Sequence, residues 1–230
     1  MGRRTGPKPS FNADDVVDAA FAGGLHVMTL AGVARSLGVA PQTLYRVYPS
    51  RDAVVVACLE RAAATLSAPD PALPWSDQLR DWAESAWRVC EEFPGLDVTI
   101  HSFPYPHIAV LPVIAALRGG LADAGFPGDA DLAIDMVGDI AVLAHMGVTT
   151  RASAAPWRRR AAARRVEEAT GSLDAGFNMN AGWPLLRAKA AAKQWMERKV
   201  EVVIAGFAAG PLPHDNNPAP RNAQGAFLAE

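Results

Sequence analysis

Polar side chains that could recognise DNA bases lie close together in the segment Pro41–Arg46. At helical spacing, Gln42, Thr43 and Arg46 point away from Leu44, which would face a core. Glutamine can form two hydrogen bonds with adenine, arginine can do so with guanine, and threonine offers a hydroxyl or touches a thymine methyl group. Base recognition is therefore one interpretation of this segment, and a merely polar outer face of a helical unit is the other.

Two short helices would hold these side chains in position. Thr29 can cap the first helix, and Gly38 suits the left-handed conformation that follows a helix end. Pro41 fits the first turn of the second helix, and Pro49 stops that helix after about two turns. A pair of short helices joined by a tight turn is a helix-turn-helix arrangement, whose second helix can enter the major groove of DNA.

The rest of the chain is expected to be all-α. Asn12 can cap a helix before the pair, Ser50 can cap a helix from Arg51 to about Leu66, and the proline-rich stretch 67–74 separates two domains. We expect a helix-turn-helix domain with a basic arm over 1–66, a second helical domain over 75–209 and an extended tail over 210–230. Within the second domain, helices are expected near 75–92, 96–102, 106–125, 129–152, 156–171 and 184–209.

Charge is distributed unevenly along a chain whose net charge is −2. The first 51 residues hold six basic and three acidic residues, a net charge of +3, so the remainder carries −5. A basic N-terminal end is compatible with polyanion binding there, or is simply a solvated tail. The sequence shows no signal-peptide or membrane-spanning pattern, and Cys58 and Cys90 lack disulfide or metal-ligand spacing, so we expect a cytoplasmic protein with two buried thiols.

Residues 11–60 resemble the DNA-binding region of the tetracycline-repressor (TetR) family. The resemblance rests on the stretch TLAGVARSLGVAPQTLYRVYPSRDAVVVACLE, with its helix start, its LGV and TLY motifs and the SRDAV sequence that opens the next helix. It implies phosphate contacts by Thr29, Tyr45 and Arg51, base contacts by Gln42, Thr43 and Arg46, and a core position for Tyr48. The implied DNA interface comprises Thr29, Pro41, Gln42, Thr43, Tyr45, Arg46 and Arg51.

Two residues depart from the family pattern. Val47 stands where many members have a histidine and cannot donate to a phosphate, and Ala40 stands where a serine or threonine cap is common. A basic arm could compensate by reaching the minor groove or neighbouring phosphates, or it could be a solvated tail. The arm residues are Arg3, Arg4 and Lys8.

The resemblance also implies that the second domain binds a small molecule and forms a homodimer. Two helical segments are the candidate dimer interface, with intramolecular packing as the alternative: Leu132, Met136, Ile140, Leu143, Gly147, Trp195, Val200, Val203 and Phe207. A candidate pocket draws aromatic, thioether and polar side chains from several helices: Trp82, Trp87, His101, Phe103, Tyr105, His107, Met136, Asp139 and His145. No two of these histidines are four residues apart, so neither a metal site nor a cofactor is expected.

These features predict a ligand-responsive repressor. It would bind a palindromic double-stranded operator as a dimer and be released by a small hydrophobic or aromatic effector, with the helix from Arg51 to Leu66 as the only direct link between the domains. The alternative is a TetR-like protein of weak or lost DNA specificity that acts through protein or ligand binding. An enzyme is disfavoured because the sequence has no nucleophile–base pair, metal motif or nucleotide loop, and no membrane partner is expected.

Overall fold

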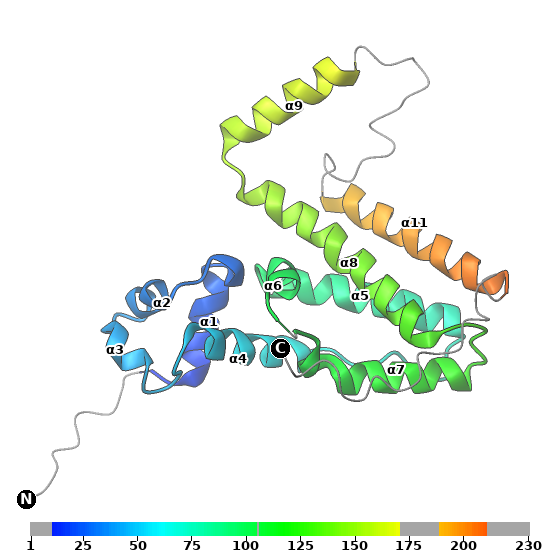
Figure 1. Ribbon diagram of the computed structural model, residues 1–230, viewed down its shortest axis with the longest axis horizontal. Coiled ribbons are helices and arrows are strands. Elements are labelled where there is room, and N and C mark those ends of the chain that lie inside the picture. The colour runs from blue at the N-terminus through cyan, green and yellow to red at the C-terminus, as the bar shows by residue number, and fades with distance from the viewer. Residues whose placement is uncertain (1–10, 105, 171–188, 211–230) are drawn as a thin grey trace, which may run out of the picture.

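The computed structural model describes residues 11–104, 106–170 and 189–210, and every regular element in these ranges is a helix, as expected. Figure 1 shows α1 to α4 at one end of the long axis and α5, α7, α8 and α11 towards the other. The elements, with η for a 3-10 helix, are α1 (Ala13–Ala22), η1 (Leu25–Val27), α2 (Leu30–Ser36), α3 (Pro41–Leu44), α4 (Arg51–Ala63), α5 (Trp75–Glu92), α6 (Leu96–Ser102), η2 (Pro106–Val110), α7 (Leu111–Asp123), α8 (Ala130–Ser153), α9 (Pro156–Thr170) and α11 (Lys189–Ala208).

Short polar side chains and a glycine fix the ends of the first helices. Asn12 accepts the Asp15 N–H at 3.0 Å while the Asp15 carboxylate accepts the Asn12 N–H at 2.7 Å, which forms a reciprocal capping box for α1. The hydroxyl oxygens of Thr29 and Ser50 each accept a backbone N–H at 3.1 Å and cap α2 and α4. Gly38 has φ of 67°, which confirms the expected left-handed residue after α2.

Two expected helices have different limits in the structure. The segment 106–125 forms η2 and then α7, because Pro112 has no N–H to donate and therefore fits only the first turn of a helix. The helix α3 has one α-helical turn rather than two. Beyond it, the N–H groups of Val47 and Tyr48 bond to the Leu44 carbonyl at 2.8 and 2.9 Å and continue the coil as turns.

Two hydrophobic cores organise the described part of the chain. The first core joins α1 to α4 and includes Leu44 and Val54, and it extends to Phe93 and Leu96 beyond the proline-rich connector. The second core lies among α5, α7, α8 and α11, with Trp87 completely buried at its centre. The helix-turn-helix unit therefore packs directly against the ends of the helices that form the second unit.

The 24-residue helix α8 is the central helix of the second unit and packs mainly against α5 and α11. Among the described helices it alone is long and apolar enough to span a membrane by length and composition. Its buried face contributes Ala133, Val137 and Ala141 to the second core. One face of α8 therefore packs inside the second unit, and the rest of the helix remains exposed.

The helix α9 extends away from the rest of the molecule (Figure 1). The Trp157 side chain is 66% exposed, and the arginines of the RRRAAARR segment are exposed along the same helix: Arg158, Arg159, Arg160, Arg164 and Arg165. The start of the last expected helix, 184–188, and the tail from 211 onward lie outside the described residues.

Candidate DNA interface and ligand cavity

The surface of α3 presents the side chains that were expected to reach bases. Leu44 is completely buried in the first core, and this contact orients the short helix. Gln42 and Arg46 are exposed on the other side, and Thr43 is half-buried beside them. None of the three makes a side-chain hydrogen bond to another described residue, so their donors and acceptors are available to a ligand.

The expected phosphate-binding residues lie around this helix. The Thr29 oxygen caps α2 by accepting the Gly32 N–H at 3.1 Å, and its own O–H remains able to donate. The Tyr45 side chain is 55% exposed. The Arg51 side chain is 45% exposed and its Nη1 lies 3.7 Å from an Asp52 carboxylate oxygen. Its Nε donates to the Met28 carbonyl at 3.2 Å, which ties the start of α4 to the residue before the Thr29 cap.

The structure explains one of the two departures from the TetR pattern. Val47 is half-buried and packs against the first core, so a hydrocarbon side chain suits its place. Tyr48 also packs against this core, with its hydroxyl 3.5 Å from the Ala13 carbonyl, and burial raises its pKa. Ala40 precedes α3 without a side-chain cap. Pro41 occupies the first position of α3. The expected basic arm lies outside the described residues: Arg3, Arg4 and Lys8.

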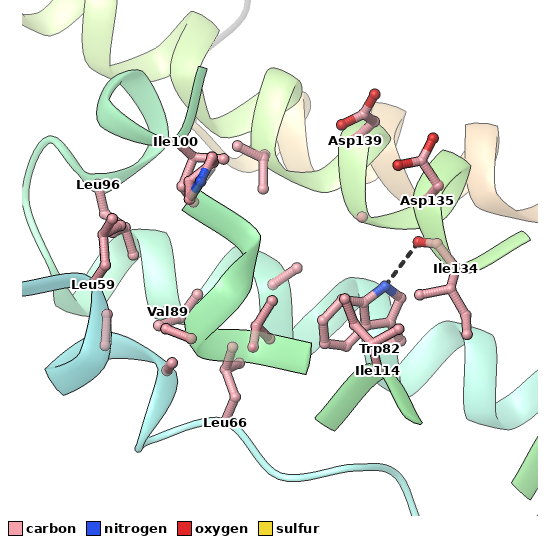
Figure 2. A pocket seen from close by; sticks show the side chains of 18 of the residues that line it. Leu59, Leu66, Trp82, Val89, Leu96, Ile100, Ile114, Ile134, Asp135 and Asp139 are labelled. Carbon is pink, nitrogen blue, oxygen red and sulfur yellow. Dashed lines mark hydrogen bonds between the residues drawn. The ribbon is translucent and has the colours of Figure 1, made fainter. Parts of the chain in front are cut away.

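A cavity of about 260 Å³ lies between the two units. Its walls come from α4, α5, α6, η2, α7 and α8, and Figure 2 shows the side chains that line it. Most of these are hydrocarbon or aromatic, namely Leu59, Ala62, Ala63, Leu66, Trp82, Ala86, Val89, Leu96, Ile100, Pro106, Ala109, Val110, Ile114, Ile134 and Val142. The remainder of the lining is Gly138 and the carboxylates Asp131, Asp135 and Asp139, so the cavity suits a small, largely apolar molecule.

Two of the residues expected in a ligand pocket, Trp82 and Asp139, line this cavity. The others that the structure describes lie elsewhere: Trp87 and His145 are buried in packing contacts, His101 and Met136 are exposed, and Phe103 packs against the first core. Tyr105 and the side chain of His107 lie outside the described residues.

Sequence reasoning missed the hydrocarbon walls of the cavity, in particular Leu59 and Leu66 at the end of the fourth helix. These walls lack the aromatic and polar side chains that were expected to mark a pocket. Leu59 belongs to the first core and Leu66 packs against it, so an apolar pattern indicates that both are partly or fully buried but does not indicate a cavity.

A buried carboxylate joins α6 to α8 beside the cavity. Asp97 is completely buried, and His145 Nδ1 lies 2.7 Å and Thr149 Oγ1 2.6 Å from the same carboxylate oxygen. The other oxygen accepts the Val98 N–H at 2.8 Å. Burial raises the pKa of Asp97, but the hydrogen bonds from these three groups outweigh burial and hold the pKa below its ordinary value. The His145 ring packs edge-on against Trp87, with centroids 5.0 Å apart.

The helix-turn-helix unit contacts the cavity unit at two places. One is α4, which begins beside α2 and lines the cavity with Leu59. The other joins η1 to the start of α6, where the Leu25 N–H donates to the Pro94 carbonyl at 2.9 Å and the rings of Phe21 and Phe93 lie 4.7 Å apart. The expectation that the fourth helix is the only direct link is therefore wrong, because η1 contacts α6 as well.

Gly95 makes the second contact possible, and we expect its replacement by alanine to be strongly destabilising. It has φ of 83°, and a Cβ there would come within 2.3 Å of His26 Nδ1 and 2.8 Å of the Leu25 nitrogen. The backbone strain alone costs about 1 kcal/mol, and displacement of η1 adds to it. Thermal or denaturant unfolding of Gly95→Ala checks this, with Gly119→Ala as a control whose Cβ meets nothing within 4 Å. Equal loss of stability in the two variants would contradict the contact.

The expected dimer residues separate into exposed and buried sets. On α8, Leu132, Met136 and Leu143 are 38%, 39% and 45% exposed, while Ile140 and Gly147 are half-buried. On α11, Val200 and Phe207 are buried in the second core of their own chain, so they do not lie on a free surface. This is a correction: the apolar stripe of the last helix packs within the chain, where the Phe207 ring lies 5.0 Å from the Phe126 ring. Trp195 and Val203 are half-buried.

The remaining polar and thiol groups do not form a metal or reactive site in the described part of the chain. No group of three or more His, Cys, Asp or Glu residues there could hold a metal ion. Cys58 and Cys90 are free and buried, as expected, and burial raises the pKa of Cys58 to about 12 and that of Cys90 further. Both thiols are therefore protonated and unreactive at neutral pH.

Solved structures of bacterial regulators share this architecture. Apo ActR from Streptomyces coelicolor matches with a TM-score of 0.64 and 19% sequence identity, over 88% of this chain and 97% of that chain. The TetR family protein ActR in complex with (S)-DNPA matches with 0.62 and 18%, over 87% and 98%. SCO7222, a TetR from the same organism, matches with 0.53 and 18%, over 88% and 100%. No protein-family model matches the sequence, and no curated protein matches it significantly.

The chain therefore has a TetR-like, all-α fold, and the likeness covers both the helix-turn-helix unit and the unit that holds the cavity. At these sequence identities the comparisons establish the fold, and the resemblance of residues 11–60 to the TetR DNA-binding region agrees with it.

Proposed function

We propose that this protein is a DNA-binding transcriptional regulator that acts as a homodimer in the cytoplasm and is released from its operator by a small molecule. The observation that carries the proposal is the surface of α3 and the turn after it, where Gln42 and Arg46 are exposed near Thr43 on a helix-turn-helix unit of TetR-like fold. These are side chains that discriminate bases in the major groove. Thr29, Tyr45 and Arg51 flank them with groups that suit phosphate contacts.

The exposed faces of α8 and α11 support a homodimer. These helices lie side by side, and their exposed apolar residues are Leu132, Met136, Leu143 and, on α11, Val202 at 72% exposure; the exposed Asp135 and Asp139 lie beside them on α8. Gly147 on α8 and Gly206 on α11 have no side chain, and a Cβ at either position would meet nothing within 4 Å of its own chain. The backbone of a second copy can therefore approach these helices closely. Four helices, two from each copy, would form a bundle that covers this apolar surface.

We expect Leu143→Glu to weaken the dimer at least about tenfold, because the symmetry places two buried charges at one apolar interface. Sedimentation at several concentrations measures the dissociation constant. Ile108→Glu is the matched control, since Ile108 is an exposed apolar residue on η2, away from the proposed bundle. A dimer that withstands Leu143→Glu, or that Ile108→Glu breaks equally, would place the interface elsewhere.

The effector would act through the two contacts between the units. A molecule in the cavity touches Leu59 on α4 and Leu96 on α6, and these helices hold the helix-turn-helix unit through Arg51 and Leu25. A ligand that prefers one arrangement of α4 and α6 shifts the spacing of the two α3 helices in the dimer. The affinity for DNA then changes by the differential affinity of the ligand for the two arrangements.

Electrophoretic mobility shifts with the DNA flanking the protein's own gene test the proposal. We expect a shifted band that survives excess unrelated DNA and disappears when Gln42 and Arg46 are both replaced by alanine. A band that unrelated DNA competes away equally well would instead favour the alternative, a TetR-like protein without DNA specificity that acts through ligand or protein binding.

A further inference from the structure

Charged residues on the cavity lining are all of one sign. Asp131, Asp135 and Asp139 follow each other at four-residue spacing on α8, and no Lys, Arg or His lines the cavity among the residues that the structure describes. Arg118 pairs with Asp131 at 3.5 Å. Asp135 and Asp139 make no ion pair or side-chain hydrogen bond with any described residue. The rim of an otherwise apolar cavity therefore carries two carboxylates without a counter-charge.

An aromatic side chain lines the same cavity as these exposed carboxylates. Trp82 lines the cavity and is 6% exposed, and its Nε1–H donates to the Ile134 carbonyl at 3.0 Å, which fixes the orientation of the ring. Figure 2 shows this hydrogen bond on the same side of the cavity as Asp135 and Asp139. Gly138 lies between the two carboxylates, and a Cβ there would meet the Trp82 ring at 3.4 to 3.8 Å. Gly138 therefore lets α8 pack closely against the indole ring.

The geometry points to a lipophilic cation as the effector, which names the ligand class for the cavity of the proposed regulator. An apolar body would fill the hydrocarbon interior between Leu66, Ile100 and Ile114, and a single ammonium group would lie at the rim. There it meets the exposed carboxylates Asp135 and Asp139 directly. An anion of the same shape would lie against uncompensated carboxylates. The volume of about 260 Å³ limits the body to one or two rings.

Three probes of the same shape and different charge test this inference. They are 1-naphthylmethylammonium, 1-naphthalenemethanol and 1-naphthoate, and binding to the full-length protein is measured by calorimetry at low salt. Each exposed ion pair changes a binding constant by about 1.5- to 5-fold, so we expect the ammonium probe to bind about tenfold more tightly than the alcohol. The naphthoate should bind most weakly. Added salt should reduce the advantage of the ammonium probe over the alcohol.

Variants of the rim identify the groups responsible. In Asp135→Asn/Asp139→Asn the advantage of the ammonium probe over the alcohol should fall to about twofold, while the affinity of the alcohol stays unchanged. The matched control is Asp123→Asn at the end of α7, which removes an exposed carboxylate that does not line the cavity. The inference is overturned if the ammonium probe does not bind, if the alcohol or the naphthoate binds as tightly, or if the preference survives in the double variant.

The same samples separate this inference from the proposed function. DNA binding without any probe tests the regulator, and the ranking of the three probes tests the cavity. Sequence-specific DNA binding with no preference for the ammonium probe overturns the cationic effector alone. A clear preference for the ammonium probe in a protein without sequence-specific DNA binding overturns the regulator and leaves the cation site in place.

Discussion

Arg46→Ala will lose most of the discrimination between operator and unrelated DNA. Arg46 is exposed in the turn that follows α3, two residues beyond the buried Leu44, and makes no ion pair with a described residue. An arginine that forms two hydrogen bonds with a guanine contributes about 1–3 kcal/mol to discrimination, which is roughly a 5- to 150-fold preference. Fluorescence anisotropy with operator and scrambled duplexes measures the ratio of the two dissociation constants. We expect this ratio to fall towards one, with the affinity for scrambled DNA almost unchanged.

Arg51→Ala provides the contrasting variant. The half-exposed guanidinium at the start of α4 suits a phosphate, so its loss should weaken binding to both duplexes alike and reduce the salt dependence by about one phosphate contact. Arg51 also donates a hydrogen bond to the Met28 carbonyl, so its loss could destabilise the fold. The unfolding temperature of Arg51→Ala is therefore measured together with its DNA affinity. Arg88→Ala, an exposed arginine on α5 far from α3 in the sequence, is the control for the loss of one positive charge. If the ratio of the two dissociation constants in Arg46→Ala equals that of the wild type, Arg46 does not contribute to base recognition.

Asp97→Ala will destabilise the protein by about 3 kcal/mol. The substitution leaves His145 and Thr149 without their acceptor in a buried position, and unpaired buried donors cost about 1–3 kcal/mol each. Asp97→Asn retains the volume and one acceptor and should lose much less. Chemical unfolding at neutral pH measures both variants. An Asp97→Ala protein as stable as the wild type would mean that this buried network does not hold α6 against α8.

The pH dependence of stability gives a second measurement of the same network. The pKa of Asp97 in the folded protein lies below that in the unfolded chain, so the unfolded chain binds a proton more readily as the pH falls. The stability contributed by Asp97 is therefore complete above the ordinary aspartate pKa of about 4 and is lost as the pH falls below it. The wild type should lose more stability than Asp97→Asn over this range. Parallel curves for the two proteins would contradict the lowered pKa.

The sequence predicted the features that local chemistry determines. Asn12, Thr29 and Ser50 cap helices, and Gly38 takes a left-handed conformation, because each effect involves only atoms a few residues away. The segment 106–125 was expected to be one helix because its apolar pattern is helical throughout. Pro112 has no N–H to donate, and the structure therefore forms η2 and then α7.

Features that depend on distant residues could not be predicted in the same way. Asp97 lies 48 positions from His145, and nothing in either local sequence indicates that the two side chains meet in a buried network. Val200 and Phe207 lie on a clear apolar stripe, but periodicity shows that a face is buried without showing whether the same chain or a partner covers it. The cavity could not be predicted for the same reason, because Leu59 and Ile114 line one space only when α4 packs against η2, the segment that leads into α7.

Selection of DNA from a random duplex library by the full-length protein tests most directly whether α3 reads DNA as part of a dimer. Two identical recognition helices related by a two-fold axis predict an enriched inverted repeat, with half-site centres about 10 base pairs apart or a multiple of that distance. Selection with Gln42→Ala/Arg46→Ala should lose the enrichment at the base pairs these residues contact. Recovery of random sequence with the wild-type protein, or of the same inverted repeat with the double variant, would contradict recognition by this surface.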